Sequence, residues 1–299
     1  VLYFFNAMAP ETSPDGSSYH LGLVARYFRE HGFPRITSSM YANLSQGLEM
    51  LFLFAFAFGE HSAAALVHFA FLLALPLAMV CYARRFGFPS AGLAGAVLVY
   101  ASPLVGADGS SAYNDVAVAS ILFTLFYLLQ IWEQERRAAL LIPIGLLAGF
   151  GYAVKYTAFL GVAYALGFVG WKLLRARQRL VRPLLVIGMC AGLMMAPWLV
   201  KNWTWLGNPV SPFFNRLFPN PYVHIAFEQE YAQRMQKYEG LSSYWAIPLE
   251  ATVRGGVLHG FVGPVFLLAP VGLLALRCSA GRRLLLAGLI FGLTYPTNV

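Results

Sequence analysis

This 299-residue chain contains two aspartates whose sequence neighbours are consistent with a reaction at a hydroxyl group. Asp15 follows Ser13-Pro14, and Asp115 follows Tyr113-Asn114 and opens an apolar run. A well-placed carboxylate can accept a proton from a reacting hydroxyl. Either acid could instead only complement the positive end of a helix. Because two acids each stand at the mouth of a helix beside aromatic and polar neighbours, we interpret both as candidate catalytic residues.

Basic and amide side chains supply candidates for binding a phosphate. Lys155 lies in Gly151-Tyr152-Ala153-Val154-Lys155-Tyr156-Thr157, at the turn between two apolar runs. It is either a lysine that reaches the membrane interface or a point charge for a phosphate in the headgroup layer. Lys201 and Asn202 follow Pro197-Trp198 and admit the same two interpretations. The candidate substrate-binding residues are Tyr19, His20, Lys155, Lys201 and Asn202.

The elements that position these residues are membrane helices. The chain is 59% hydrophobic and 11% charged, with a mean hydropathy of +0.61, whereas soluble domains carry roughly 25% charged residues. Apolar runs of about 17 residues or more can cross the hydrocarbon core as helices. We therefore predict an all-α, polytopic integral membrane bundle. Its expected spans are 62–83, 88–105, 115–132, 156–171, 183–200 and 260–276, with 138–154 and 284–297 as two less certain ones.

The distribution of basic residues predicts the orientation of these spans. Twelve of the 21 Lys and Arg residues fall in short loops on one side, where Glu133 and Glu135 are the acids. An excess of Lys and Arg marks cytoplasmic loops. The net charge of +8 is then a topology signal, and nothing points to nucleic acid. The outer segments are expected at about 9–61, 106–114 and 202–259, which places the candidate site on the outer face of the inner or plasma membrane.

The first outer segment is expected to carry juxtamembrane helices. Ser13-Pro14-Asp15 is a helix-start signal, and Gly32-Phe33-Pro34 ends the pattern. The run 48–58 is too short to span a membrane and predicts a re-entrant or interfacial segment. A polar helical stretch is expected near 226–239.

The two ends of the chain suggest a fragment. The sequence opens with Val1-Leu2-Tyr3-Phe4-Phe5, without an initiator methionine, and stops after an apolar run. We expect residues 1–299 to form one transmembrane domain truncated at both ends.

Common cofactor and nucleophile motifs are missing from the sequence. The histidines form no i, i+4 pair or Glu-x-x-His pattern, which argues against a histidine metal site. The three cysteines fall within spans or at their cytoplasmic ends, so they predict no outer disulfide or cysteine-rich metal site. Neither a glycine-rich phosphate loop nor a serine nucleophile elbow occurs. We predict no metal-ligand set, and a requirement for a divalent cation stays open.

Five stretches in order resemble the bacterial GT-C glycosyltransferases, relatives of dolichyl-phosphate-mannose protein mannosyltransferases and of the lipid A aminoarabinose transferase. The resemblance covers essentially the whole chain. The stretches are Pro14-Asp15-Gly16-Ser17-Ser18-Tyr19-His20-Leu21, Tyr41-Ala42-Asn43-Leu44-Ser45-Gln46, Ala112-Tyr113-Asn114-Asp115, Gly151-Tyr152-Ala153-Val154-Lys155-Tyr156-Thr157, and Pro197-Trp198-Leu199-Val200-Lys201-Asn202 with Gly207-Asn208-Pro209-Val210-Ser211-Pro212.

This resemblance implies sugar transfer on the outer, periplasmic face, with inversion, from a polyprenyl-phosphate donor to a lipid, glycan or protein acceptor. The family's first-loop aspartate accepts the acceptor proton, and it corresponds to Asp15. Many relatives have Asp-Glu where this chain has Asp15-Gly16, so the role of a second acid is left unassigned. A competing interpretation is a lipid or solute transporter or flippase, which would place charges within its spans and break helices in two matching halves. A membrane protein without activity is a third interpretation.

Overall fold

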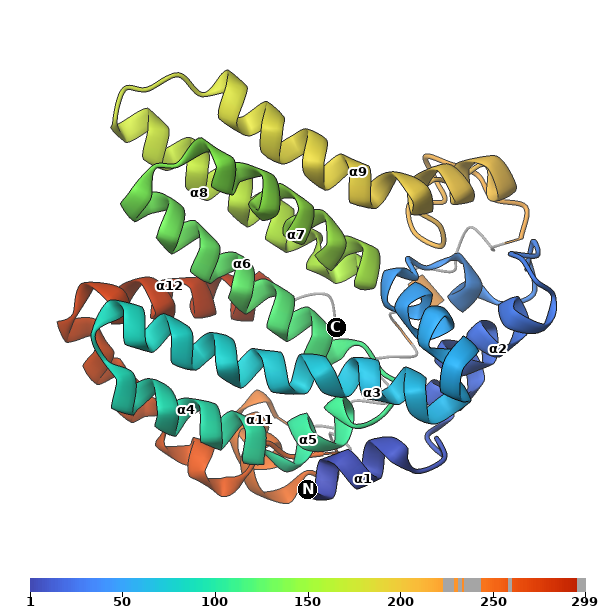
Figure 1. The fold of residues 1–299 in the computed structure, drawn as a ribbon, viewed down its shortest axis with the longest axis horizontal. Coiled ribbons are helices and arrows are strands. Elements are labelled where there is room, and N and C mark those ends of the chain that lie inside the picture. Colours follow the sequence, from blue (N-terminus) through green and yellow to red (C-terminus); the bar gives the residue numbers. More distant parts are fainter. Residues whose placement is uncertain (223–228, 231–232, 234–242, 258–259, 295–299) are drawn as a thin grey trace. The chain divides into compact units, whose positions relative to one another are not determined.

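The structure is a computed structural model, and it describes residues 1–222, 229–230, 233, 243–257 and 260–294. Within these ranges the regular structure is helical and contains no strand (Figure 1). The helices are α1 (Leu2–Met8), η1 (Gly16–His20), α2 (Leu21–Arg29), η2 (Met40–Asn43), α3 (Gly47–Phe86), α4 (Pro89–Ala101), α5 (Pro103–Gly109), α6 (Asp115–Glu135), η3 (Ala138–Leu140), α7 (Leu141–Val154), η4 (Tyr156–Ala158), α8 (Phe159–Arg175), α9 (Val181–Leu206), η5 (Tyr244–Ala246), α11 (Ile247–Leu249), η6 (Glu250–Arg254), η7 (Pro264–Arg277) and α12 (Ser279–Thr294).

The chain divides into two compact units. The first unit comprises Val1–Ala78 and Asp108–Ile225, and the second comprises Met79–Ala107 and Ala226–Val299. All the candidate site residues belong to the first unit. In the second unit, α12 packs against η7, and the hydroxyl of Tyr82 donates to the carbonyl of Ala280 at 3.3 Å.

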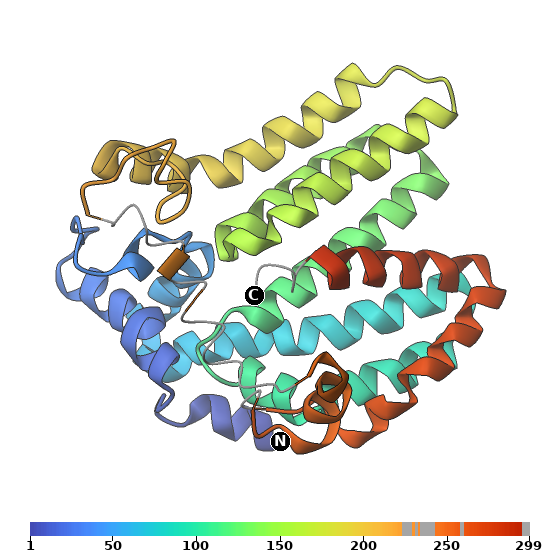
Figure 2. The same cartoon turned by 180° about the vertical axis from the view of Figure 1, so that it is seen from behind.

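Helices α6, α7, α8 and α9 form a bundle in the first unit (Figures 1 and 2). Gly145 and Gly149 of α7 face α9, where a Cβ added to Gly145 would lie 2.7 Å from the Cβ of Cys190. A Cβ on Gly149 would overlap the backbone of Ala191. Small residues four apart let membrane helices approach closely. This spacing therefore explains the close packing of α7 on α9.

Several helices of the chain present apolar side chains outward. On α9, Leu185, Met189 and Leu193 recur every four residues and are exposed. Such a stripe is typical of a helix face that contacts lipid, because exposing apolar side chains to water is unfavourable. Helices α3, α6 and α9, together with Tyr156–Arg175, are each long and apolar enough to cross a membrane. The chain is thus a polytopic all-α membrane protein, as the sequence predicts.

The number of long spans differs from the eight expected. The structure has four such helices among the described residues, or five if α4 and α5 count as one span bent by 68°. The bend follows from Pro103, which cannot donate a backbone hydrogen bond to continue α4. Residues 138–154 and 264–277 form shorter apolar helices, and α12 is described only as far as Thr294. Most of the predicted stretch 226–239 lies outside the described residues.

The predicted boundary between the outer segment 9–61 and the span 62–83 lies inside α3. Gly59 and Glu60 have non-helical backbone angles, and Glu60 has φ 54° and ψ −136°. The short run 48–58 is therefore the first part of α3, and the break separates it from the expected span 62–83. Whether this first part is re-entrant or interfacial stays a prediction.

One hydrophobic cluster supports the outer-segment residues of the first unit. It joins buried residues of α2, α3 and α6 with the end of α7. Its members from the first outer segment and the start of α3 are Leu21, Val24, Leu48, Phe52 and Phe56. The cluster also contains Ala112, just before α6, and Ala117, Val118 and Ile121 of α6. It therefore brings the two aspartate-bearing segments onto the same core.

The charge pattern gives a testable topology. Residues 172–182 are expected inside, because Lys and Arg concentrate in this loop, and residues 202–259 are expected outside. Single cysteines replacing Arg177 or Glu230, both exposed, would be introduced after Cys81, Cys190 and Cys278 are removed. A membrane-impermeant maleimide should label Glu230→Cys in intact cells and spare Arg177→Cys. Labelling with the opposite preference would overturn the orientation.

Candidate active site

The helix that carries Asp15 is capped by another residue. The hydroxyl of Ser13 accepts a hydrogen bond from the backbone N–H of Gly16 at 3.2 Å, and Pro14 takes the first helical position. Ser13 therefore caps the helix as the sequence predicts. Asp15 makes no side-chain capping hydrogen bond and is exposed. Capping thus does not account for the Asp15 carboxylate.

The hydroxyl of Tyr19 interacts electrostatically with both candidate acids. The ring of Tyr19 stacks on that of Tyr41 with centroids 4.1 Å apart. Burial raises the pKa of Tyr19, and the charges of Asp15 and Asp115 raise it further. Both carboxylates therefore act on one hydroxyl. Their use of a shared substrate stays a prediction.

The start of α6 is capped by side chains distant in sequence. Asp108 accepts a hydrogen bond from the N–H of Val116 at 2.9 Å. His68, which is fully buried, accepts one at Nε2 from the N–H of Ala117 at 3.2 Å. Asn114, the residue before the helix, makes no side-chain cap. The first-turn N–H groups of Val116 and Ala117 thus find partners without Asp115.

The hydrogen bonds of His68 assign its neutral tautomer. Its Nδ1 lies 2.9 Å from the carbonyl oxygen of Ser111, which can only accept. The proton is therefore on Nδ1, and Nε2 is the acceptor for Ala117. His68 joins the loop before α6 to its first turn through this pair of bonds.

Asp115 pairs with Lys155. Nζ of Lys155 lies 2.5 Å from Oδ1 of Asp115, and the two side chains are 35% and 57% exposed. Lys155 reaches this position because α7 ends at Val154 and the backbone of Lys155 is extended. An exposed ion pair contributes only about 0–1 kcal/mol. An incoming phosphate could therefore share or replace the carboxylate at Lys155 at small cost.

His20 and Glu49 form a second, buried pair. Nδ1 of His20 lies 2.6 Å from Oε1 of Glu49, and both side chains are almost inaccessible to solvent. The ring centroid of His20 is 6.0 Å from that of Tyr113. Oε2 of Glu49 is buried and has no hydrogen-bond partner among the described residues. The pair fixes η1, which carries Tyr19, to the start of α3.

Lys201 and Asn202 hold the first outer segment against α9. Nζ of Lys201 donates to the carbonyl of Ala42 at 2.7 Å, and Nδ2 of Asn202 donates to that of Asn43 at 2.6 Å. Asn202 is fully buried and also donates to the hydroxyl of Tyr156 at 3.0 Å. Through these contacts both residues of α9 bind the backbone of η2, which is a structural role. Their predicted role in substrate binding stays a prediction.

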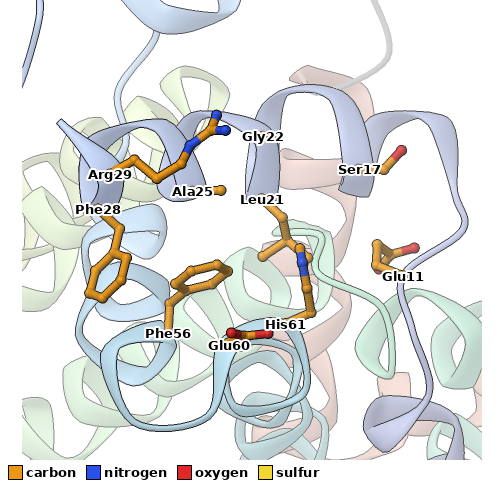
Figure 3. A pocket seen from close by; sticks show the side chains of 10 residues that line it. All are labelled: Glu11, Ser17, Leu21, Gly22, Ala25, Phe28, Arg29, Phe56, Glu60 and His61. Atoms are coloured by element: carbon orange, nitrogen blue, oxygen red, sulfur yellow. The ribbon is translucent and has the colours of Figure 1, made fainter.

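A cavity of about 510 Å³ lies between α2 and the broken part of α3 (Figure 3). Phe28 and Phe56 lie toward one end of it, and Glu11 and Ser17 toward the other. Glu60 and His61, at the break in α3, complete the lining together with Leu21, Gly22, Ala25 and Arg29 of α2. None of the predicted site residues lines this cavity. The described residues also contain no group of three His, Cys, Asp or Glu side chains suited to a metal ion.

A family model described as dolichyl-phosphate-mannose-protein mannosyltransferase matches residues 48–201. The match covers just over half of the chain and contains Asp115, Lys155 and the capping residues Asp108 and His68. The chain belongs to this family. No curated protein and no solved structure matches it.

Membership in the mannosyltransferase family makes this chain a membrane glycosyltransferase of the GT-C type. The family implies a polyprenyl-phosphate-sugar donor, an acceptor and a membrane setting. The matched range begins after Asp15, so the assignment of that residue rests on the resemblance of the first outer segment.

Four polar residues near the site escaped prediction: Glu11, Glu49, His68 and Asp108. For Glu49 and His68 a signal was present, because ionisable residues inside apolar runs are costly unless they have a partner. Nothing local marks the partners themselves, which lie 29 positions away for Glu49 and 49 for His68.

Proposed function

We propose that this protein transfers a sugar from a polyprenyl-phosphate donor to an acceptor hydroxyl at the outer face of the membrane, with inversion at the anomeric carbon. Asp15 is the general base. The acceptor oxygen forms a bond to the anomeric carbon while the bond from that carbon to the phosphate oxygen breaks. The acceptor proton passes to Asp15, and the electron pair of the broken bond leaves with the lipid phosphate.

Lys155 and Asp115 serve the leaving group in this proposal. The departing phosphate gains negative charge, which a cation at the membrane edge stabilises. Lys155 supplies that cation, and Asp115 holds the ammonium group in place before the donor arrives. Tyr19 lies within electrostatic reach of Asp15, and in this proposal its hydroxyl orients the carboxylate toward the acceptor.

The observation that carries the proposal is the accessible Lys155 and Asp115 pair at 2.5 Å. It is supported by the pKa of Tyr19, which the charges of both Asp15 and Asp115 raise. A base, a cation and an orienting hydroxyl are thus gathered on one unit of the fold. The capping hydrogen bonds at both helix starts come from other residues, which supports a role for the two acids beyond capping.

The decisive experiment is transfer by the purified protein in lipid nanodiscs. A panel of polyprenyl-phosphate sugars would be offered with simple lipid, glycan and peptide hydroxyl acceptors. We expect transfer from at least one donor, with the anomeric configuration of the product inverted by NMR. Retention of configuration would exclude the direct displacement, and transfer from nucleotide sugars alone would exclude the lipid-linked donor.

A further inference from the structure

Glu11 joins the two segments that carry the candidate acids. Its Oε2 accepts a hydrogen bond from the backbone N–H of Ala112 at 2.8 Å, across 101 positions of sequence. Its Oε1 accepts from the N–H of Ser13 at 2.8 Å and from the hydroxyl of Ser13 at 2.6 Å. One carboxylate thereby bonds at once to the residues just before Asp15 and to the loop just before Asp115.

Gly16 leaves the room that this arrangement needs. A Cβ added at position 16 would lie 2.5 Å from Cδ of Glu11 and 2.6 Å from the hydroxyl oxygen of Ser13. Both distances are far shorter than real Cβ contacts. The carboxylate of Glu11 therefore occupies the space that any side chain at position 16 would take, directly beside Asp15.

The surroundings of Glu11 favour its ionised form. Partial burial alone would raise the pKa of Glu11, but hydrogen bonds from Ala112 and Ser13 outweigh it and hold the pKa below its ordinary value. An ionised carboxylate is an acceptor on both oxygens, which the bonds to Ala112 and Ser13 require. The link between the segments is accordingly intact at neutral pH.

We propose that Glu11 is a positioning residue that sets the placement of Asp15 relative to Asp115 by bonding both segments through one carboxylate. It acts through Ser13 and Ala112 and does not itself contact substrate. This inference rests on the proposed function of the two aspartates. A hydrogen bond from Nδ2 of Asn6 to the hydroxyl of Ser110 at 2.7 Å also joins the start of the chain to the loop before α6, so loss of Glu11 loosens the arrangement without separating it.

The test compares Glu11→Ala, Glu11→Gln, Gly16→Ala and the double variant Glu11→Ala with Gly16→Ala. Small misplacements of reacting groups can reduce rates by up to about 100-fold. We expect Glu11→Ala and Gly16→Ala each to lower kcat by about tenfold, with the donor KM changed little. Glu11→Gln keeps one acceptor oxygen and should fall between wild type and Glu11→Ala. The double variant should be slower than Glu11→Ala by clearly less than the factor that Gly16→Ala costs in the wild type, because the alanine at position 16 then meets only the hydroxyl of Ser13.

The controls are Glu30→Gln, an exposed acid of the same outer segment, and Gly32→Ala, where an added Cβ meets only one atom, at 3.9 Å. Both should retain wild-type turnover. Full additivity of Glu11→Ala and Gly16→Ala would overturn the proposal, as would wild-type turnover of Glu11→Ala. If Glu11→Ala does not fold, the comparison of Glu11→Gln with Glu30→Gln decides on the same criterion.

A second readout separates this inference from the proposed function. The amide hydrogen of Ala112 should exchange with solvent faster in Glu11→Ala and Gly16→Ala than in wild type, by at least about tenfold, whether or not the protein transfers sugar. Hydrogen exchange followed by mass spectrometry of peptides covering residues 110–114 measures this. Unchanged exchange in both variants refutes the link itself, whereas faster exchange in a protein that transfers no sugar refutes only the proposed chemistry.

Discussion

Replacement of Asp15 by asparagine is expected to abolish sugar transfer while the protein stays folded and inserted. The amide keeps nearly the same size, but it cannot take up the proton of the acceptor hydroxyl. General base catalysis contributes about 10²- to 10⁴-fold, so kcat should fall by at least that range. Transfer by the purified variant under saturating donor measures it.

The structure makes this a clean test, because helix capping is the work of Ser13. Asp15→Asn should therefore unfold at the wild-type temperature, and Glu30→Gln serves as a control acid in the same segment. Turnover of Asp15→Asn within about threefold of wild type would end the assignment of Asp15 as the base.

Replacement of Lys155 by alanine is expected to weaken use of the donor more than it slows chemistry at saturation. Hydrogen bonds to charged groups contribute about 1.5–3 kcal/mol, which corresponds to a rise in donor KM of about 10- to 100-fold. Donor titration at fixed acceptor separates KM from kcat. A fall in kcat with an unchanged donor KM would place Lys155 elsewhere in the reaction.

Helix α6 offers a matched control for this variant. Lys172 pairs with Glu133 near the end of α6 at 2.5 Å, just as Lys155 pairs with Asp115 at its start. Lys172→Ala removes a lysine–carboxylate pair of the same length, but less exposed, at the predicted cytoplasmic end. Its donor KM should match wild type. An equal rise in both variants would show that the effect comes from the stability of α6 and not from the phosphate.

Helix class and several boundaries follow from the sequence because they depend on local properties. A long apolar run in lipid forms a helix, because the helix pairs the backbone N–H and C=O groups within the segment. Ser13-Pro14 starts a helix where expected, and the break in α3 falls between the two apolar runs that the sequence separates. Among the described residues, four of the predicted spans correspond to helices long enough to cross a membrane, one corresponds to the bent pair α4 and α5, and 138–154 and 260–276 correspond to shorter apolar helices. Hydropathy alone does not register helix length or a bend such as that at Pro103.

The candidate site was predictable only in part. Spacing and residue type singled out Asp15, Asp115 and Lys155, and the structure pairs two of these. The sequence also allowed each acid to do no more than complement the positive end of its helix. The structure places Asp115 in the first turn of α6, while no side-chain capping hydrogen bond comes from Asp15. Both caps come from other residues, and Asp108 and His68 reach the first turn of α6 from 8 and 49 positions away.

The sequence by itself determined the membrane-embedded helical class, the expected orientation and the residue types available for transfer, because hydropathy, charge and helix-start signals act over a few residues. Only the tertiary structure decided which polar groups meet: Lys155 with Asp115, His20 with Glu49, and Glu11 with Ala112. These contacts join residues 40, 29 and 101 positions apart. Such partners depend on how the shared core of α2, α3 and α6 packs, and no local spacing encodes that packing.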